Sequence, residues 1–129
     1  MKKLVMLLVA LMALPGCAGG SAQGEYRQIS MEQAADMMEQ ETDYILLDVR
    51  TAAEYQQGHI PGAVCIPNES IGTEEIPELP DKEQKILVYC RSGNRSKQAS
   101  AKLAKLGYTN VYEFGGILDW TGETVTGGN

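Results

Sequence analysis

The sequence contains few of the residues that metal sites and nucleic-acid interfaces require. Its 129 residues include one histidine, and its three cysteines, Cys17, Cys65 and Cys90, form no Cys-X-X-Cys pair. Structural zinc sites use several closely spaced cysteines and histidines, so we expect neither a metal nor a cofactor. Lysine and arginine number 11 against 17 acidic residues, which gives a formal charge of −6. A chain this acidic is not expected to bind nucleic acid.

The sequence also lacks an apolar run long enough to span a bilayer. Its longest run, Leu4–Leu14, has eleven residues and follows Lys2 and Lys3. A membrane-spanning helix needs about 20 apolar residues, whereas a run of this length after positive charges is typical of a signal peptide. We therefore expect residues 1–16 to be a signal peptide and the protein to be exported.

A cysteine follows this run at the position where bacterial lipoproteins are processed. Leu14-Pro15-Gly16-Cys17 resembles the lipobox of that class of proteins, in which the cysteine is lipidated and becomes the new N-terminus. The resemblance implies lipidation of Cys17, a tether over residues 17–25, and a membrane anchor that faces the periplasm or the cell exterior. An ordinary secretory signal, cut near Ala18 or Ala22, is the alternative.

The rest of the chain alternates strand and helix patterns. Capping boxes at Ser30 and Thr51 indicate two helix starts, the second helix ending at Gly58, and a third helix is expected over residues 94–106. Strands are expected at 26–29, 44–49, 63–66, 85–89 and 111–114, with Gly115-Gly116 ending the last and an irregular connection over 67–81.

This alternation predicts an α/β domain over residues 26–122 with a mainly parallel sheet. A functional site is then expected at the carboxyl ends of the strands. Residues 123–129 are expected to be a flexible tail. The length of the chain suits a single domain, and we expect a monomer.

Cys90 lies where a buried strand meets a glycine-containing loop and a helix N-terminus, in the segment Val88-Tyr89-Cys90-Arg91-Ser92-Gly93-Asn94-Arg95-Ser96. Inward-pointing backbone amides and the helix dipole favour an anion there. The same features lower the pKa of a cysteine thiol below its usual value of about 8.5. We therefore predict that Cys90 is a nucleophilic thiolate and that an anion-binding loop comprises Arg91, Ser92, Gly93, Asn94 and Arg95.

A thiolate activated in this way needs no histidine base. The single histidine, His59, is distant from Cys90 in the sequence, which argues against a papain-type cysteine–histidine pair. The alternative interpretation is that Cys90 is a buried structural cysteine, and the flanking Arg-Ser-Gly-Asn-Arg sequence favours a reactive one.

Several motifs together resemble the single-domain rhodanese (sulfurtransferase) family between about Ile29 and Trp120. They are, in chain order, Leu47–Arg50, Glu54-Tyr55, Gly58–Ala63, Ile66-Pro67, Val88–Ser96, Gly107-Tyr108 and Phe114–Trp120. The resemblance implies a five-stranded parallel sheet flanked by helices. It also implies that Cys90 forms a persulfide with sulfur from thiosulfate or a related anion and passes it to cyanide or a thiol. The amides of residues 91–95 would hold the donor, and Arg95 would pair with its oxygens.

Two other functions remain open at this point. A carrier that holds sulfur on Cys90 for a partner, without rapid turnover, would have the same motifs. Phosphatase-like hydrolysis is less favoured, because related dual-specificity phosphatases have five residues between cysteine and arginine. Four residues separate Cys90 from Arg95, and this narrower loop suits a sulfur atom better than a tetrahedral phosphate.

Four further residues near the expected site are assigned structural roles. Asp48 and Arg50 are expected to hold loops in place, and Glu54 to pair with Arg50. His59 is expected to order the turn before Pro61.

Cys65 is expected to be an inert thiol in a buried strand. The sheet order implied by the resemblance separates its strand from that of Cys90, so no disulfide is expected between them.

Overall fold

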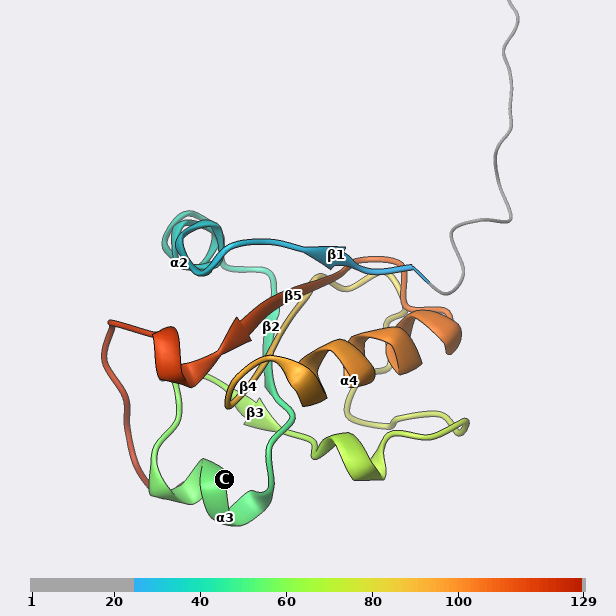
Figure 1. The fold of residues 1–129 in the computed structure, drawn as a ribbon. Helices are drawn as coiled ribbons and strands as arrows, with labels where there is room; N and C mark the ends of the chain where they lie inside the picture. Colours follow the sequence, from blue (N-terminus) through green and yellow to red (C-terminus); the bar gives the residue numbers. More distant parts are fainter. Residues whose placement is uncertain (1–24, 129) are drawn as a thin grey trace, which may run out of the picture.

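The computed structural model describes residues 25–128, and Figure 1 shows their fold. The predicted signal peptide and the lipidation site Cys17 lie outside the described residues, as does the predicted tether except for Glu25. The elements are, in chain order, β1 (Arg27–Gln28), α2 (Met31–Gln40), β2 (Ile45–Asp48), α3 (Ala52–Gln57), β3 (Val64–Cys65), the 3-10 helix η2 (Asn68–Ser70), β4 (Ile86–Cys90), α4 (Asn94–Lys105), β5 (Val111–Gly116) and the 3-10 helix η3 (Ile117–Asp119).

The five strands form one sheet in the order β1-β5-β4-β2-β3, and every neighbouring pair is parallel. This confirms the predicted five-stranded α/β fold. Parallel strands place their carboxyl ends at one edge of the sheet, so the ends of β2 and β4 lie side by side. Asp48 is paired with Tyr89, next to Cys90.

Both predicted capping boxes are present at the helix starts. The Ser30 hydroxyl accepts a hydrogen bond from the Gln33 amide at 3.0 Å, and the Gln33 side chain accepts one from the Ser30 amide at 2.9 Å. The same reciprocal pair joins Thr51 and Glu54 at the start of α3. These caps fix where α2 and α3 begin.

Two apolar clusters fill the two faces of the sheet. One lies under α4 and includes Ala99 and Leu103, whereas the other lies under α2 and α3 and includes Ala34 and Tyr55. Strand β4 is buried on both faces, as expected for a central parallel strand. Its side chains alternate between the clusters, so Cys90 faces α4, together with Ile86 and Val88.

Two strand predictions were wrong. The segment 63–66 was predicted to be a buried strand, but β3 lies at the sheet edge, and its Val64 is 45% exposed. Gly115-Gly116 was predicted to end the last strand, but β5 continues to Gly116, which pairs with Cys90 after a shift in register. The glycines allow this shift, since Gly115 has a φ of 100°.

The segment predicted to be a flexible tail makes backbone contacts with α3 and the loop after it. Val125 exchanges two hydrogen bonds of 2.8 Å with His59, and the Gly127 amide donates to the Gln56 carbonyl at 2.7 Å. Trp120 and the residues that follow it therefore return the chain toward α3.

None of the helices in residues 25–128 is long and apolar enough to cross a membrane.

Candidate active site

Cys90 ends β4, and the next three residues turn the chain directly into α4. Gly93 caps this helix with a φ of 115°, a left-handed conformation that glycine adopts most readily. In this geometry the Gly93 amide donates a hydrogen bond to the Cys90 sulfur at 3.0 Å. The loop therefore directs its backbone donors at the thiol, as the sequence predicts.

The pKa of Cys90 is lowered although the side chain is buried. Burial by itself raises the pKa, since it disfavours the charged thiolate. Hydrogen bonds from the Ser96 hydroxyl and from the amides of Ser96, Gly93 and Ser92 outweigh that effect. The thiolate is thus stabilised by a set of donors in the loop and the first turn of α4.

Ser96 contacts Cys90 directly, although the sequence analysis did not assign it to the site. Its buried hydroxyl lies 3.4 Å from the Cys90 sulfur and 2.5 Å from Oε2 of Glu113 on β5. Glu113 is also buried. The position of Ser96, six residues after Cys90 in the first turn of the helix, was the available signal. Nothing in the local sequence connects Glu113 to this loop.

Arg95 pairs with Glu54, which corrects the expected pairing of Glu54 with Arg50. Two hydrogen bonds, of 2.8 and 3.1 Å, join the Arg95 guanidinium to the Glu54 carboxylate. These bonds, with further ones from Thr51, lower the pKa of Glu54 to about 2. The guanidinium predicted to hold donor oxygens therefore already has a carboxylate partner.

Arg50 instead pairs with Asp48, and both side chains are buried. Arg50 Nη2 lies 2.7 Å from Asp48 Oδ2 and donates to the Gly58 carbonyl at 2.6 Å. The pair thereby links the carboxyl end of β2 to the end of α3. This arrangement agrees with the expected role of Asp48 and Arg50 in holding loops in place.

His59 also contacts α3 rather than Cys90. Its ring stacks on the Tyr55 ring with centroids 3.7 Å apart, and its Nδ1 lies 2.8 Å from the Tyr55 carbonyl. Its backbone pairs with Val125. These contacts fix the turn that precedes Pro61.

Cys65 and Cys90 are both free, and β2 separates their strands. Cys65 is partly buried, and this burial, followed by the charge of Asp48, raises its pKa to about 11. Cys65 is therefore a protonated, poorly nucleophilic thiol at neutral pH, in contrast to Cys90.

Three predicted loop residues, Arg91, Ser92 and Asn94, are exposed. Arg91 lines a pocket of about 300 Å³ with Glu54 and Leu118. The backbone of Arg91 also packs tightly on β5, because a Cβ atom at Gly116 would lie 2.0 Å from the Arg91 carbonyl oxygen. The absence of a side chain at Gly116 therefore lets the loop approach the sheet.

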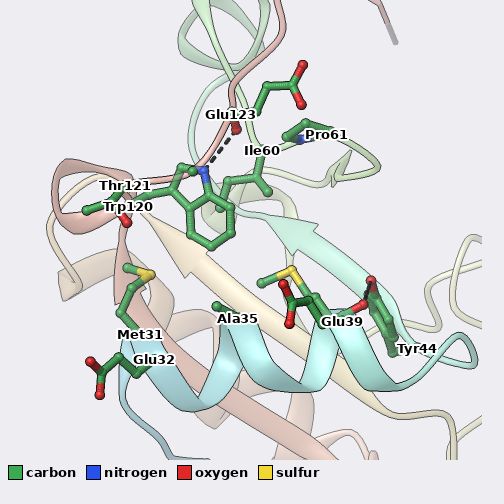
Figure 2. A pocket seen from close by; sticks show the side chains of 12 residues that line it. Met31, Glu32, Ala35, Glu39, Tyr44, Ile60, Pro61, Trp120, Thr121 and Glu123 are labelled. Atoms are coloured by element: carbon green, nitrogen blue, oxygen red, sulfur yellow. Dashed lines mark hydrogen bonds between the residues drawn. The ribbon is translucent and has the colours of Figure 1, made fainter.

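A larger pocket of about 640 Å³ lies between α2 and the segments 60–61 and 120–123. In Figure 2, Trp120 stands over Ala35, with Glu32, Glu39 and Glu123 around the opening. None of the predicted site residues lines this pocket. Within the described residues, no group of His, Cys, Asp and Glu side chains is placed to hold a metal ion.

A family model described as the Rhodanese-like domain matches residues 30–123. The chain belongs to this family. The matched region contains β2 to β5 and the whole Cys90 loop, and the resemblance found in the sequence motifs is confirmed.

Three relatives from bacteria support sulfur transfer as the general activity of this rhodanese-like protein. Thiosulfate sulfurtransferase PspE of Escherichia coli (strain K12) is 40% identical over 73 residues, which are 57% of this chain and 70% of that protein. A sulfurtransferase of Allochromatium vinosum is 39% identical over 94 residues, 72% of this chain and 86% of that protein. The putative sulfur carrier protein YrkF of Bacillus subtilis (strain 168) is 35% identical over 98 residues, 75% of this chain and 52% of that protein.

A solved structure described as a rhodanese with anions from E. coli shares the fold. It has 39% sequence identity and a TM-score of 0.59, and the similarity covers 65% of this chain and 99% of that one. The similarity to the solved rhodanese agrees with the parallel sheet and flanking helices described above.

Proposed function

We propose that this protein is a rhodanese-type sulfurtransferase that carries sulfane sulfur on Cys90. The observation that carries the proposal is the set of donors aimed at the Cys90 sulfur from one side by the loop and α4. Such donors stabilise a thiolate before reaction and the terminal sulfur of a persulfide after it. The activity named for PspE makes thiosulfate the first donor to test.

In the first half-reaction the Cys90 thiolate attacks the outer sulfur of thiosulfate. A sulfur–sulfur bond to Cys90 forms, the sulfur–sulfur bond of thiosulfate breaks, and sulfite leaves with the bonding electron pair. In the second half-reaction a thiolate or cyanide attacks the outer sulfur of the persulfide. The Cys90 thiolate is then regenerated as the leaving group, and once Cys90 is a thiolate neither half-reaction requires a base or a metal.

Arg95 and Arg91 provide the positive charge that an anionic donor requires in an acidic protein. Since Arg95 is paired with Glu54, the donor oxygens would compete with this carboxylate for the guanidinium. Arg91 is exposed at the rim and available without that competition.

Steady-state thiocyanate production from thiosulfate and cyanide tests the enzyme proposal. We expect turnover in the wild type, loss of at least about a thousandfold in Cys90→Ser, since the nucleophile itself is removed, and near wild-type turnover in Cys65→Ser. Absence of turnover in the folded wild type would contradict the proposal.

A sulfur carrier is the second candidate, favoured by the similarity to the putative carrier YrkF. The carrier would load one sulfur on Cys90 and release it only to a partner protein. Stoichiometric loading by thiosulfate without steady-state thiocyanate production would select this function over the enzyme.

Phosphatase-like hydrolysis is tested with a generic aryl phosphate. We expect no turnover, since the four-residue spacing between Cys90 and Arg95 forms a loop sized for sulfur. Hydrolysis by the wild type and not by Cys90→Ser would contradict this argument.

We also propose that the domain is exported and anchored through Cys17. The support is the sequence alone: a short apolar run after two lysines, followed by Gly16-Cys17. Labelled fatty acid should be incorporated by the wild type and not by Cys17→Ala. Secretion without incorporation would select an ordinary signal peptide.

A further inference from the structure

Glu113 is a buried acidic side chain for which the proposed sulfur-transfer cycle has no role. The residue is 2% exposed and lies on β5, beside the first turn of α4. Its Oε2 accepts hydrogen bonds from the Ser96 hydroxyl at 2.5 Å and the Gly115 amide at 3.0 Å. Its Oε1 lies 3.4 Å from the side-chain nitrogen Nε2 of Gln28.

None of these partners carries a positive charge, and no ion pair within residues 25–128 includes Glu113. A carboxylate buried without a cation is costly unless hydrogen bonds compensate it, and here the Ser96 hydroxyl and the Gly115 amide both donate to it. These two donors hold the carboxyl group in a fixed position next to Ser96.

Ser96 connects this carboxyl group to the nucleophile. The Ser96 oxygen lies 3.4 Å from the Cys90 sulfur and 2.5 Å from Glu113 Oε2. A hydroxyl has one proton to donate. The Ser96 hydroxyl also lies 3.0 Å from the Gly93 carbonyl and 3.3 Å from the Gly115 carbonyl, but its shortest contact is with Glu113. When Ser96 donates to Glu113, its oxygen can accept a hydrogen bond from the Cys90 thiol. When Cys90 is the thiolate, Ser96 donates to the sulfur and leaves Glu113.

We propose that Glu113 is a positioning residue that acts through Ser96 and stores the proton released when Cys90 becomes a thiolate. The sulfur–hydrogen bond of Cys90 breaks as its proton passes to Ser96, and the Ser96 proton passes to Glu113 Oε2. The pair changes from thiol and carboxylate to thiolate and carboxylic acid, and its charge stays at −1.

The proposal rests on Cys90 being the reactive thiol, as in the proposed function, but not on the identity of the sulfur donor. It explains why the buried site does not need a histidine. The proton need not leave for solvent before the thiolate reacts, because it remains on Glu113, and only the Ser96 hydroxyl lies between Glu113 and Cys90.

The elements packed against β5 are β1, β4, α2 and α4. Besides Glu113, the charged or titratable group that faces Cys90 is Arg95 on α4, which is paired with Glu54. Tyr89 on β4 lies on the other face of the sheet. The remaining charged side chains of these elements are exposed or hydrogen-bonded elsewhere: Arg27, Glu32, Asp36, Glu39, Lys97, Lys102 and Lys105.

The pH dependence of Cys90 alkylation by iodoacetamide tests this coupling, because the uncharged reagent reports the thiolate without using the donor site. The modified peptide is quantified by mass spectrometry, so Cys17 and Cys65 do not interfere. Two coupled groups titrate in two macroscopic steps. We expect two steps in the wild type, separated by a plateau over which the pair shares one proton.

Glu113→Gln keeps the shape of the side chain and removes the proton acceptor, so we expect a single step. Ser96→Ala removes the connection and should lose the lower step, whereas Ser96→Thr keeps a hydroxyl and should retain both steps. A single step in the wild type, or two unchanged steps in Glu113→Gln, would overturn the proposal.

Far-UV circular dichroism and thermal unfolding establish that each variant is folded. If Glu113→Gln does not fold, the comparison of Ser96→Ala with Ser96→Thr decides, and equal profiles in these two variants overturn the proposal. Loading with thiosulfate is measured separately. Failure to load sulfur would contradict the proposed function while leaving the two-step alkylation profile intact.

Discussion

At the scale of single residues, the lowered pKa of Cys90 is explained by the groups that surround its sulfur atom. Two thiols of the described chain differ in this respect: donors outweigh burial at Cys90, and burial prevails at Cys65. The difference comes from the left-handed glycine at position 93 and the serine at position 96, which bring donors to one thiol only.

Gly93→Ala should weaken both the loop and the thiolate. A side chain at a φ of 115° is strained, at a cost of about 1–3 kcal/mol, and relief of the strain moves the amide that donates to Cys90. We expect a lower free energy of unfolding in urea and slower alkylation of Cys90 near neutral pH. Gly72→Ala is the matched control, since nothing lies within 4 Å of its added Cβ and its backbone is not left-handed. Equal effects of the two substitutions would contradict this role of Gly93.

Gly116→Ala should displace the Cys90 loop from the side that faces β5. The added Cβ would lie 2.0 Å from the Arg91 carbonyl oxygen, so the backbone of β5 or of the loop must shift. Overpacking of this kind costs about 1–3 kcal/mol. Urea unfolding should show this loss, and thiocyanate production should fall more than in Gly72→Ala. Wild-type stability and turnover in Gly116→Ala would show that the close approach is unimportant.

At the scale of elements, two ion pairs connect α3 to the elements around the site. Arg95 and Glu54 join α4 to α3, and Arg50 and Asp48 join the end of β2 to the end of α3.

The sequence predicted the starts of α2 and α3 correctly, because capping boxes are local patterns. It could not predict which arginine meets Glu54, since that depends on how α3 and α4 approach across the sheet.

The dependence on how elements pack also explains why the sequence analysis did not assign Glu113 to the site. Its partner Ser96 is 17 residues away, and the two meet because β5 lies next to β4 and beneath α4. Conversely, the strand, loop and helix start around Cys90 could be predicted, because they are contiguous in the sequence. The edge position of β3 depends on sheet order, which its short apolar sequence does not reveal.

The Glu54–Arg95 pair should make stability sensitive to acid. The pKa of Glu54 is about 2 in the folded protein and about 4.3 in an unfolded chain. A lowered carboxyl pKa stabilises the folded state above the unfolded pKa, and this stabilisation is lost as the pH falls from about 4.3 toward 2. Since both side chains are 28% exposed, the contribution is about 1 kcal/mol or less.

Urea unfolding at pH 6 and at pH 3 measures this contribution. We expect Glu54→Gln to be less stable than the wild type at pH 6 and to lose less stability than the wild type on acidification. Glu74→Gln, which changes an exposed glutamate, is the control and should follow the wild type. Identical pH dependence of Glu54→Gln and the wild type would contradict the pairing.

At the scale of the whole molecule, the proposed function places a local anion site on an acidic protein. The formal charge of −6 opposes an anionic donor, whereas the amides of the loop, the N-terminus of α4 and two arginines would attract it at the carboxyl end of β4. The parallel sheet makes this possible by placing the end of a buried strand and the start of a helix next to each other. It also keeps Cys65 two strands away from Cys90.

The central claim is that Cys90 accepts a sulfur atom, and the mass of the protein after thiosulfate treatment tests it most directly. After removal of excess thiosulfate, the mass of the wild type and of Cys65→Ser should increase by one sulfur atom, located on the peptide that contains Cys90. Cys90→Ser should remain unmodified. An unmodified wild type, or sulfur found on Cys65 instead, would contradict the account.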